Sequence, residues 1–366
     1  MTIHAVISGS AVHLDWQNKS KLSNSQEALT HRGEALRLIN QEISQLKGKE
    51  PSDALLLAIL ALTPNPPHTC TQLVTTSNSQ LFQPSQSQLG WEHNRLNVQY
   101  SQDHHLGLFT LVKQRGGLTT FRNQSVARMI SSHDLGIATQ ELRSPRQPFV
   151  QDIEISKLIS NSNLNILEPN PYESTPGLSL AKLLHTIGCY PLSSVLLQLQ
   201  RIVATTEALR HNTLRNINTP ALYGEKQALH HATLSLQAYS DSSYEALRIV
   251  TLIYVVGIFF PVPSSTGIFV HLVHSMKESL DKIDLHQLQD IRIKAFTWTL
   301  FIGGMMAKGM PHRDWYITNL TMLVKLQDLT RWIDIKQLLR SFIWLSHAMD
   351  DEAISLWEDI RRSQDL

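Results

Sequence analysis

This chain of 366 residues has few cysteines and no large excess of charge of either sign. It contains two cysteines, Cys70 and Cys189, which excludes a disulfide scaffold and any zinc module built from several cysteines. Its 32 Lys and Arg residues balance 31 Asp and Glu residues, so the net charge is +1. A DNA-binding module has a clear excess of basic residues. These scarcities exclude a chain that consists of a basic nucleic-acid-binding module.

Long hydrophobic runs and a secretory leader are also missing. The most apolar stretch covers residues 249–260, whereas a membrane span needs about 20 apolar residues. The first residues include no basic segment followed by an apolar one. We therefore expect a soluble intracellular protein in which residues 249–260 form a buried helix.

Apolar residues recur at helical spacing along most of the chain. Leu29, Leu36 and Ile43 lie on one stripe of a helix predicted at 25–46. Ser52 or Asp53 is expected to cap an apolar core helix at 54–62. A helix at 104–113 is expected to end in a left-handed turn at Arg115-Gly-Gly117, before a short element that begins at Leu118.

The second half of the sequence is almost continuously helical in pattern, and no strand pattern extends beyond a few residues. Asp334 is expected to cap the last predicted helix. The predicted helices cover 177–189, 192–210, 224–239, 243–260, 267–282, 287–305, 315–326 and 335–361. The sequence therefore predicts an all-α fold, formed by a single large domain.

One segment departs from this pattern. Residues 63–103 are rich in Pro, Ser, Gln and Asn and have no sustained period, which favours a long loop or a disordered insertion. The predicted organisation is thus N-terminal helices at 1–62, an insertion at 63–103 and the remaining helices at 104–366.

Histidine is abundant, with 17 residues, but its spacing is that of structural positions. Adjacent residues on a helix point about 100° apart, so the pairs His104-His105 and His230-His231 rarely converge on one ion. His271 and His274 are three residues apart and could share a face, with Glu278 nearby, but no acid accompanies them as in His-Glu-x-x-His. We expect no metal site.

Acidic residues gather near the C-terminus at Asp350-Asp351-Glu352 and Glu358-Asp359. Such groups hold magnesium and a diphosphate in helical terpenoid synthases, but no second acidic motif accompanies them here. Arg361 and Arg362 are placed to pair with Glu358 and Asp359, so a solvated helix face is the favoured interpretation. A helical lyase or synthase that acts on a diphosphate is the weakest alternative.

Motifs of other enzymes are weak or missing. The glycines in Ile302-Gly-Gly-Met-Met-Ala-Lys-Gly309 follow no strand and do not match a phosphate-binding loop. Cys189 lies in an apolar setting that predicts a buried thiol, and Cys70 lies in the polar insertion. We expect a non-enzyme without catalytic, cofactor-binding or metal-binding residues and without a cofactor.

Six helical segments, in one order, resemble the fungal-specific transcription factor domain, which is the regulatory region of zinc binuclear cluster proteins. No block is specific by itself, but their order is. The blocks are His105-Leu-Gly-Leu-Phe-Thr-Leu-Val-Lys-Gln-Arg-Gly-Gly-Leu118, Ser132-His-Asp134 (similar to an acidic helix end) with Arg146-Gln-Pro-Phe149, Tyr244-Glu-Ala-Leu-Arg-Ile-Val-Thr-Leu-Ile-Tyr254, Phe296-Thr-Trp-Thr-Leu-Phe-Ile-Gly-Gly304, Arg313-Asp-Trp-Tyr316, and Phe342-Ile-Trp344 with Leu356-Trp-Glu358.

The resemblance implies a nuclear regulatory domain that modulates transcription by RNA polymerase II through self-association or partner contacts. In this family DNA contact belongs to a separate module with six cysteines, which two cysteines cannot build. We therefore expect no direct nucleic acid binding and no membrane contact by this chain. An alternative is a protein without a DNA site of its own that heterodimerises with a full-length zinc-cluster factor.

Two further expectations concern the effector and the insertion. An apolar pocket for a small-molecule effector would have walls at 254–260 and 296–306. The insertion at 63–103 and the abrupt start at Met1 suggest a truncated product or a translated intron, with a tolerated surface insertion as the equal alternative. A contiguous mature message across codons 60–105 would exclude the intron.

Overall fold

The computed structural model describes residues 1–17, 26–65, 99–100, 102–151, 178–188, 190–211, 219–260 and 267–364. The chain divides into two compact units. Unit 1 is Met1–Ser79, Asn94–Glu141 and Pro145–Asp152, and unit 2 is Gln80–His93, Leu142–Ser144 and Ile153–Leu366. Helices dominate both units, which confirms the predicted all-α class. Most of the predicted insertion, 66–98 and 101, lies outside the described residues.

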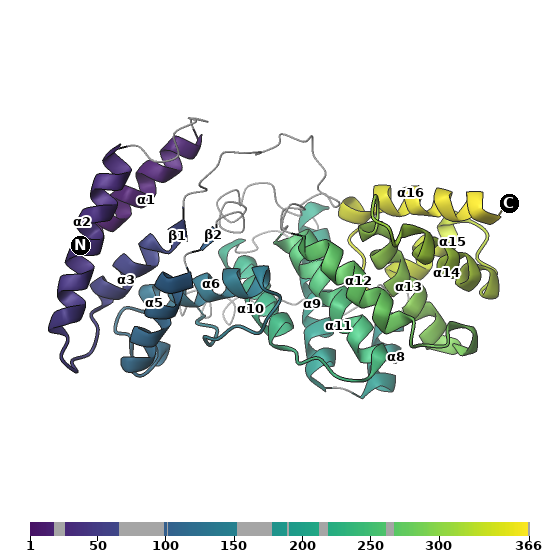
Figure 1. Cartoon of the computed structure of the whole chain (residues 1–366). Coiled ribbons are helices and arrows are strands. Elements are labelled where there is room, and N and C mark those ends of the chain that lie inside the picture. The colour runs from purple at the N-terminus through teal and green to yellow at the C-terminus, as the bar shows by residue number, and fades with distance from the viewer. Residues whose placement is uncertain are drawn as a thin grey trace. The chain divides into compact units, whose positions relative to one another are not determined.

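Unit 1 is a group of helices with one minimal strand pair. Two-residue strands β1 and β2 pair antiparallel, with Pro64 opposite Tyr100. Its elements are α1 (Thr2–Gln17), α2 (Gln26–Gln45), α3 (Asp53–Leu62), β1 (Pro64–Asn65), β2 (Gln99–Tyr100), α5 (Gln102–Gln114), the 3-10 turn η1 (Leu118–Thr120) and α6 (Gln124–Gln140) (Figure 1).

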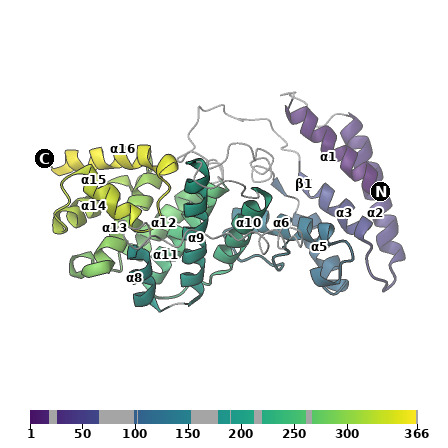
Figure 2. The ribbon, with the colours of Figure 1, turned by 180° about the vertical axis from the view of Figure 1, so that it is seen from behind.

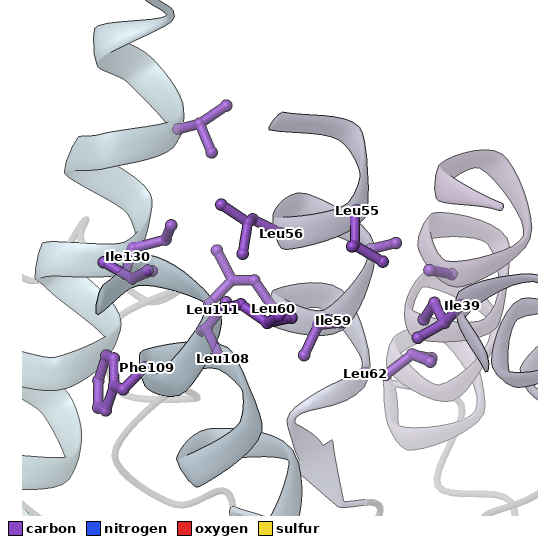
Figure 3. Packing of buried hydrophobic residues seen from close by; sticks show 14 of the residues in the cluster. Ile39, Leu55, Leu56, Ile59, Leu60, Leu62, Leu108, Phe109, Leu111 and Ile130 are labelled. Carbon is purple, nitrogen blue, oxygen red and sulfur yellow. The ribbon is translucent and has the colours of Figure 1, made fainter. Parts of the chain in front are cut away.

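The helix α3 is the centre of the unit 1 core. Figure 3 shows its leucine and isoleucine side chains between Ile39 of α2 on one side and α5 and α6 on the other. Leu55 and Leu56 are fully buried, and the apolar residues of α3 that are not buried are limited to Ala54, Leu57 and Ala61. The predicted cap is confirmed, since the Ser52 side chain accepts a hydrogen bond of 3.1 Å from the Leu55 backbone N–H.

Helix α5 ends, as predicted, at a turn that contains two consecutive glycines. Gly116 and Gly117 have φ angles of 100° and 92°, and the Gly117 N–H donates to the Val112 carbonyl at 2.9 Å. This geometry brings Arg115 to the start of α3, where its guanidinium forms an ion pair with Asp53 and donates to the Pro51 carbonyl at 3.0 Å. The motif is thus structural, as the sequence indicated.

The short element predicted to begin at Leu118 is the 3-10 turn η1. The sequence analysis did not predict the helix that follows it, the 17-residue α6 at Gln124–Gln140. Asp134 lies inside this helix, not at an acidic helix end, and is fully buried. Its carboxylate accepts a hydrogen bond of 2.7 Å from the Gln147 N–H, and Ser131 donates to the Pro148 carbonyl at 2.8 Å. These contacts hold the 145–150 segment against α6.

Unit 2 contains the helices of the second half. Figures 1 and 2 show α13, α14 and α16 lying together within this unit. Its elements are α8 (Leu178–Ile187), α9 (Tyr190–Arg210), α10 (Thr219–Ser235), α11 (Ser242–Tyr254), the π-helix η2 (Val255–Phe259), α12 (Ile268–Leu280), the 3-10 turn η4 (Leu285–Gln287), α13 (Asp290–Met306), α14 (Arg313–Leu326), α15 (Trp332–Arg340) and α16 (Ser346–Gln364).

The apolar stretch at 249–260 is a buried helical segment, as predicted. It spans α11 and η2, where every residue from Ile249 to Phe259 is buried. Among the described residues, one helical span, Ser242–Phe259, is long and apolar enough to cross a membrane, and 78% of it is buried inside the protein. Core helices of this composition commonly pass that test.

The predicted single helix at 335–361 is in fact two helices. Its N-terminal part, α15, begins at Trp332, so Asp334 lies in its first turn and does not cap Ile335. Asp334 instead forms an ion pair of 2.8 Å with Arg331. The chain leaves helical geometry between α15 and α16, and Trp344 in that break donates to Asp350 at 2.8 Å.

The helix α13 is buried continuously from Ala295 to Met306. Gly303 faces α14 and α12 so closely that an added Cβ would lie 2.5 Å from Tyr316 Cε1 and 2.6 Å from Met276 Sδ. Tyr316 cannot withdraw freely, because it is fully buried and donates to the Val273 carbonyl at 2.9 Å. The glycine at 303 is therefore required by helix packing.

We expect Gly303→Ala to lower the free energy of unfolding by about 1–3 kcal/mol, which is the usual cost of overpacking a core. Thermal unfolding followed by far-UV circular dichroism measures the change. Gly33→Ala is the control, because nothing lies within 4 Å of a Cβ added there. That variant should gain up to about 1 kcal/mol from helix propensity. A Gly303→Ala protein as stable as the wild type would contradict the packing argument.

Candidate functional site

Three of the five acidic residues on α16, Asp350, Glu352 and Asp359, are partners of basic side chains outside this helix. Asp350 forms an ion pair of 2.7 Å with Lys336 of α15, and Glu352 forms one of 2.7 Å with Lys308. Both pairs join α16 to its neighbours in unit 2. These carboxylates are thus engaged in packing contacts rather than grouped to face a metal ion.

Asp359 ties α16 to two other helices. It lies 2.6 Å from Arg313 at the start of α14 and 2.9 Å from Arg362 one turn further along α16. The Arg313 guanidinium also donates to the Gly304 carbonyl of α13. The predicted Asp359–Arg362 pair is confirmed, and the guanidinium of Arg313 supplies a cross-helix partner that spacing did not predict.

The exposed histidines of α12 pair with neighbours on the surface. His274 lies 3.2 Å from His312, Nδ1 to Nε2, and 3.3 Å from Glu278. His271 is exposed on the same helix. Within the described residues, no three His, Cys, Asp or Glu side chains gather in a way that would hold a metal ion.

The adjacent histidine pairs each place one ring in a core. His105 is buried in unit 1, with its ring 4.2 Å from Phe109 and 5.6 Å from His133 between centroids. His230 is buried in unit 2 and stacks on Phe260 at 4.9 Å. Burial and the neighbouring His231 lower the pKa of His230 to about 3, so this ring is neutral at physiological pH.

The two predicted pocket walls, 254–260 and 296–306, meet in the core of unit 2. Tyr254 and Trp298 both donate to the carbonyl of Ile343, the indole from 2.9 Å. Their rings stack with centroids 6.2 Å apart, and Phe342 stacks on Trp298 at 5.5 Å. The two segments therefore pack against each other through Tyr254 and Trp298.

At the η2 end lies a residue that the sequence analysis missed. Lys226 of α10 is 1% exposed, and its ammonium group lies 5.1 Å from the centroid of the Phe259 ring in η2. Burial lowers the pKa of Lys226 to about 8. Lysine is among the residues least often buried without a partner. The sequence around Lys226 does not indicate that this residue is buried, because an exposed lysine on a helix would have the same spacing from its apolar neighbours.

A second polar group surrounds the start of α16, where Glu207 of α9 is the central residue. Its carboxylate accepts a hydrogen bond of 2.7 Å from the Ser346 N–H and lies 3.4 Å from His211. The side chain of His347 is 8% exposed, and its Nδ1 is 4.0 Å from the same carboxylate. Glu207 thereby satisfies a free N–H at the beginning of α16.

Electrostatics connect this group to the buried lysine. Burial lowers the pKa of His347 most, and the positive charges of Arg210, His211 and Lys226 lower it further, while Glu207 raises it. The cations of α9 and α10 thus act together on the imidazole.

Other predicted features fall in the core or outside the described residues. Gly303 and Gly304 lie inside α13, so the glycine-containing segment at 302–309 is part of a packed helix and its end. Cys70 and Cys189 both lie outside the described residues, so the buried thiol expected at Cys189 stays a prediction.

Comparison with known proteins gives one match. No curated protein and no solved structure matches the chain. The family model for the fungal specific transcription factor domain matches residues 2–365, which is nearly the whole sequence. The match covers both units and includes the six helical blocks whose order resembled this family. The chain therefore belongs to the family of fungal-specific transcription factor domains.

Proposed function

We propose that this chain is a nuclear, non-catalytic regulatory domain that modulates transcription by RNA polymerase II through contacts with a second copy of itself or with a related factor. The family match over residues 2–365 carries the proposal. The net charge of +1 and the two cysteines support it, because phosphate neutralisation by Lys and Arg supplies most sequence-independent DNA affinity. DNA contact then comes from another module.

The surface of the first two helices supports a role in protein contacts. Helices α1 and α2 run antiparallel, as His4 lies 2.7 Å from His31 and Ser8 donates to the Ala28 carbonyl. They expose Ile3 by 73% and Leu29 by 52%. Large exposed apolar side chains are the kind of group that partner chains bury.

Tethering tests this proposal. The chain is fused to a heterologous DNA-binding module with a reporter gene under its operator, and reporter expression is compared with the module alone at equal protein abundance. We expect a change of at least several-fold. In parallel, sedimentation of the chain, alone and mixed with a full-length zinc-cluster relative, identifies the partner. An unchanged reporter would overturn the regulatory role.

A charge-introducing variant locates the contact. Ile3→Asp with Leu29→Asp should abolish the association and return the reporter to its baseline, because a charge in an apolar interface remains unpaired. Leu326→Asp on α14 is the matched control, since Leu326 is exposed by 54% but belongs to unit 2. If both variants behave alike, α1 and α2 are not the contact surface.

A further inference from the structure

The buried lysine of α10 has no counter-charge among the residues that the structure describes. Lys226 is 99% buried, and none of the ion pairs among the described residues includes it. Its ammonium group instead lies over the face of Phe259. Burying a charge without an ionic partner is strongly unfavourable. We expect the cost of burying this charge to be offset by another interaction of Lys226.

Two carboxylates of α9 and α10 have partners of their own. Glu207 of α9 accepts a hydrogen bond from the Ser346 N–H at the start of α16. Glu225, the residue before Lys226 in α10, accepts one of 3.4 Å from Gln198. Neither carboxylate forms an ion pair with Lys226.

The site also has an aromatic wall. The π-helix η2 places Phe259 under the ammonium group of Lys226, and the next residue, Phe260, contacts Tyr223 at 6.2 Å and His230 at 4.9 Å between ring centroids. Irregular π-helical turns occur often at functional sites, because they displace side chains from the regular helical positions. Here the irregular turn joins an apolar surface to a buried cation.

We infer that Lys226, together with the ring of Phe259, forms a binding site for a small organic anion. A carboxylate or phosphate of this anion pairs with Lys226, and its carbon skeleton packs on Phe259. Charge-assisted hydrogen bonds of this kind are about twice as strong as neutral ones. The inference rests on the proposed regulatory function and names the class of ligand that would act as its effector.

Calorimetric titration of the full chain with four probes tests the inference. Succinate and benzoate present carboxylates, whereas inorganic phosphate and phenyl phosphate present phosphoryl groups, and sodium chloride of equal ionic strength is the blank. We expect at least one probe to bind saturably. The pair of probes with the higher affinity shows whether the site prefers a carboxylate or a phosphoryl group. A higher affinity of the probes that have a phenyl ring shows that the apolar contact is formed. No saturable binding beyond chloride by any probe overturns the site.

Variants assign the binding to this lysine. Lys226→Met, which keeps the length of the side chain, should weaken binding at least tenfold. Lys308→Met should not, because Lys308 is a surface residue paired with Glu352. Equal affinity in all three proteins would overturn the assignment.

Proton uptake gives a readout that needs no variant. Because the pKa of Lys226 is about 8, half of the Lys226 side chains are neutral amines at pH 8. Binding of an anion should therefore be accompanied by uptake of a proton from the buffer by Lys226. The apparent binding enthalpy at pH 8 should then depend on the ionisation enthalpy of the buffer. A buffer-independent enthalpy would overturn the role of Lys226. Because the reporter assay requires no ligand, failure here is distinguishable from failure of the regulatory role.

Discussion

Trp298→Ala is expected to lower the free energy of unfolding by about 3–5 kcal/mol, the range for large aromatic residues removed from a core. Trp298 is fully buried and stacks on Phe342, and its indole N–H reaches the Ile343 carbonyl. The loss corresponds to a melting temperature lower by roughly 6–20 °C, at about 2–4 °C per kcal/mol for a domain of this size. Thermal melts followed by far-UV circular dichroism measure it.

Two further variants separate the contribution of the indole N–H from that of the buried aromatic ring. Trp298→Phe keeps an aromatic ring in the stack but removes the N–H, so about 1–2 kcal/mol should be lost. Trp332→Ala is the matched control, because Trp332 is only half-buried at the start of α15. It should cost less than half as much as Trp298→Ala. Equal losses for the two alanine variants would contradict the central position of Trp298 in unit 2.

The helices that the sequence predicted well are those whose stability comes from local signals. The serine cap and the apolar run of α3 are both local, and Ser52 and Leu55 form the expected contact. The left-handed turn after α5 depends on Gly116 and Gly117, whose φ angles no other residue adopts easily. Periodicity, caps and glycine were therefore sufficient for such elements.

The elements that the sequence predicted poorly depend on contacts between distant segments. In α6, Ser131 and Asp134 are polar residues on a buried face, and their partners lie at Pro148 and Gln147. The break between α15 and α16 contains no proline or glycine. It coincides instead with long-range bonds from Tyr254 and Trp298 to Ile343. A periodicity argument cannot detect such partners.

The candidate site was only partly predictable for the same reason. The segment 254–260 was identified as a wall because it is apolar, and it does supply Phe259 and Phe260. Lys226, in contrast, is buried because of what packs over α10, and its helical position alone is equally compatible with a solvent-exposed lysine. Burial of a charge becomes visible only when the tertiary structure is known.

Because Lys226 is buried as a cation, Lys226→Met is expected to stabilise the protein without ligand at pH 7. The pKa of Lys226 is about 8 in the folded chain against 10.5 for an ordinary lysine. A difference of this size disfavours the charged folded state by about 3 kcal/mol at pH 7. The contact with Phe259 offsets up to about 1 kcal/mol of this. The net gain should be about 2–3 kcal/mol, measured by chemical denaturation.

The pH dependence distinguishes this cause from better packing. Between pH 8 and 10.5 the unfolded chain retains the Lys226 proton that the folded chain has released, so wild-type stability should rise with pH in this window. The advantage of Lys226→Met should therefore shrink by about 2 kcal/mol from pH 7 to pH 9.5. His230 does not interfere, because its pKa of about 3 keeps it neutral. Burial raises the pKa of Tyr254 above its ordinary value, which has an opposing effect only above about pH 10. An advantage of Lys226→Met that stays constant up to pH 9.5 would show that the buried charge is not its source.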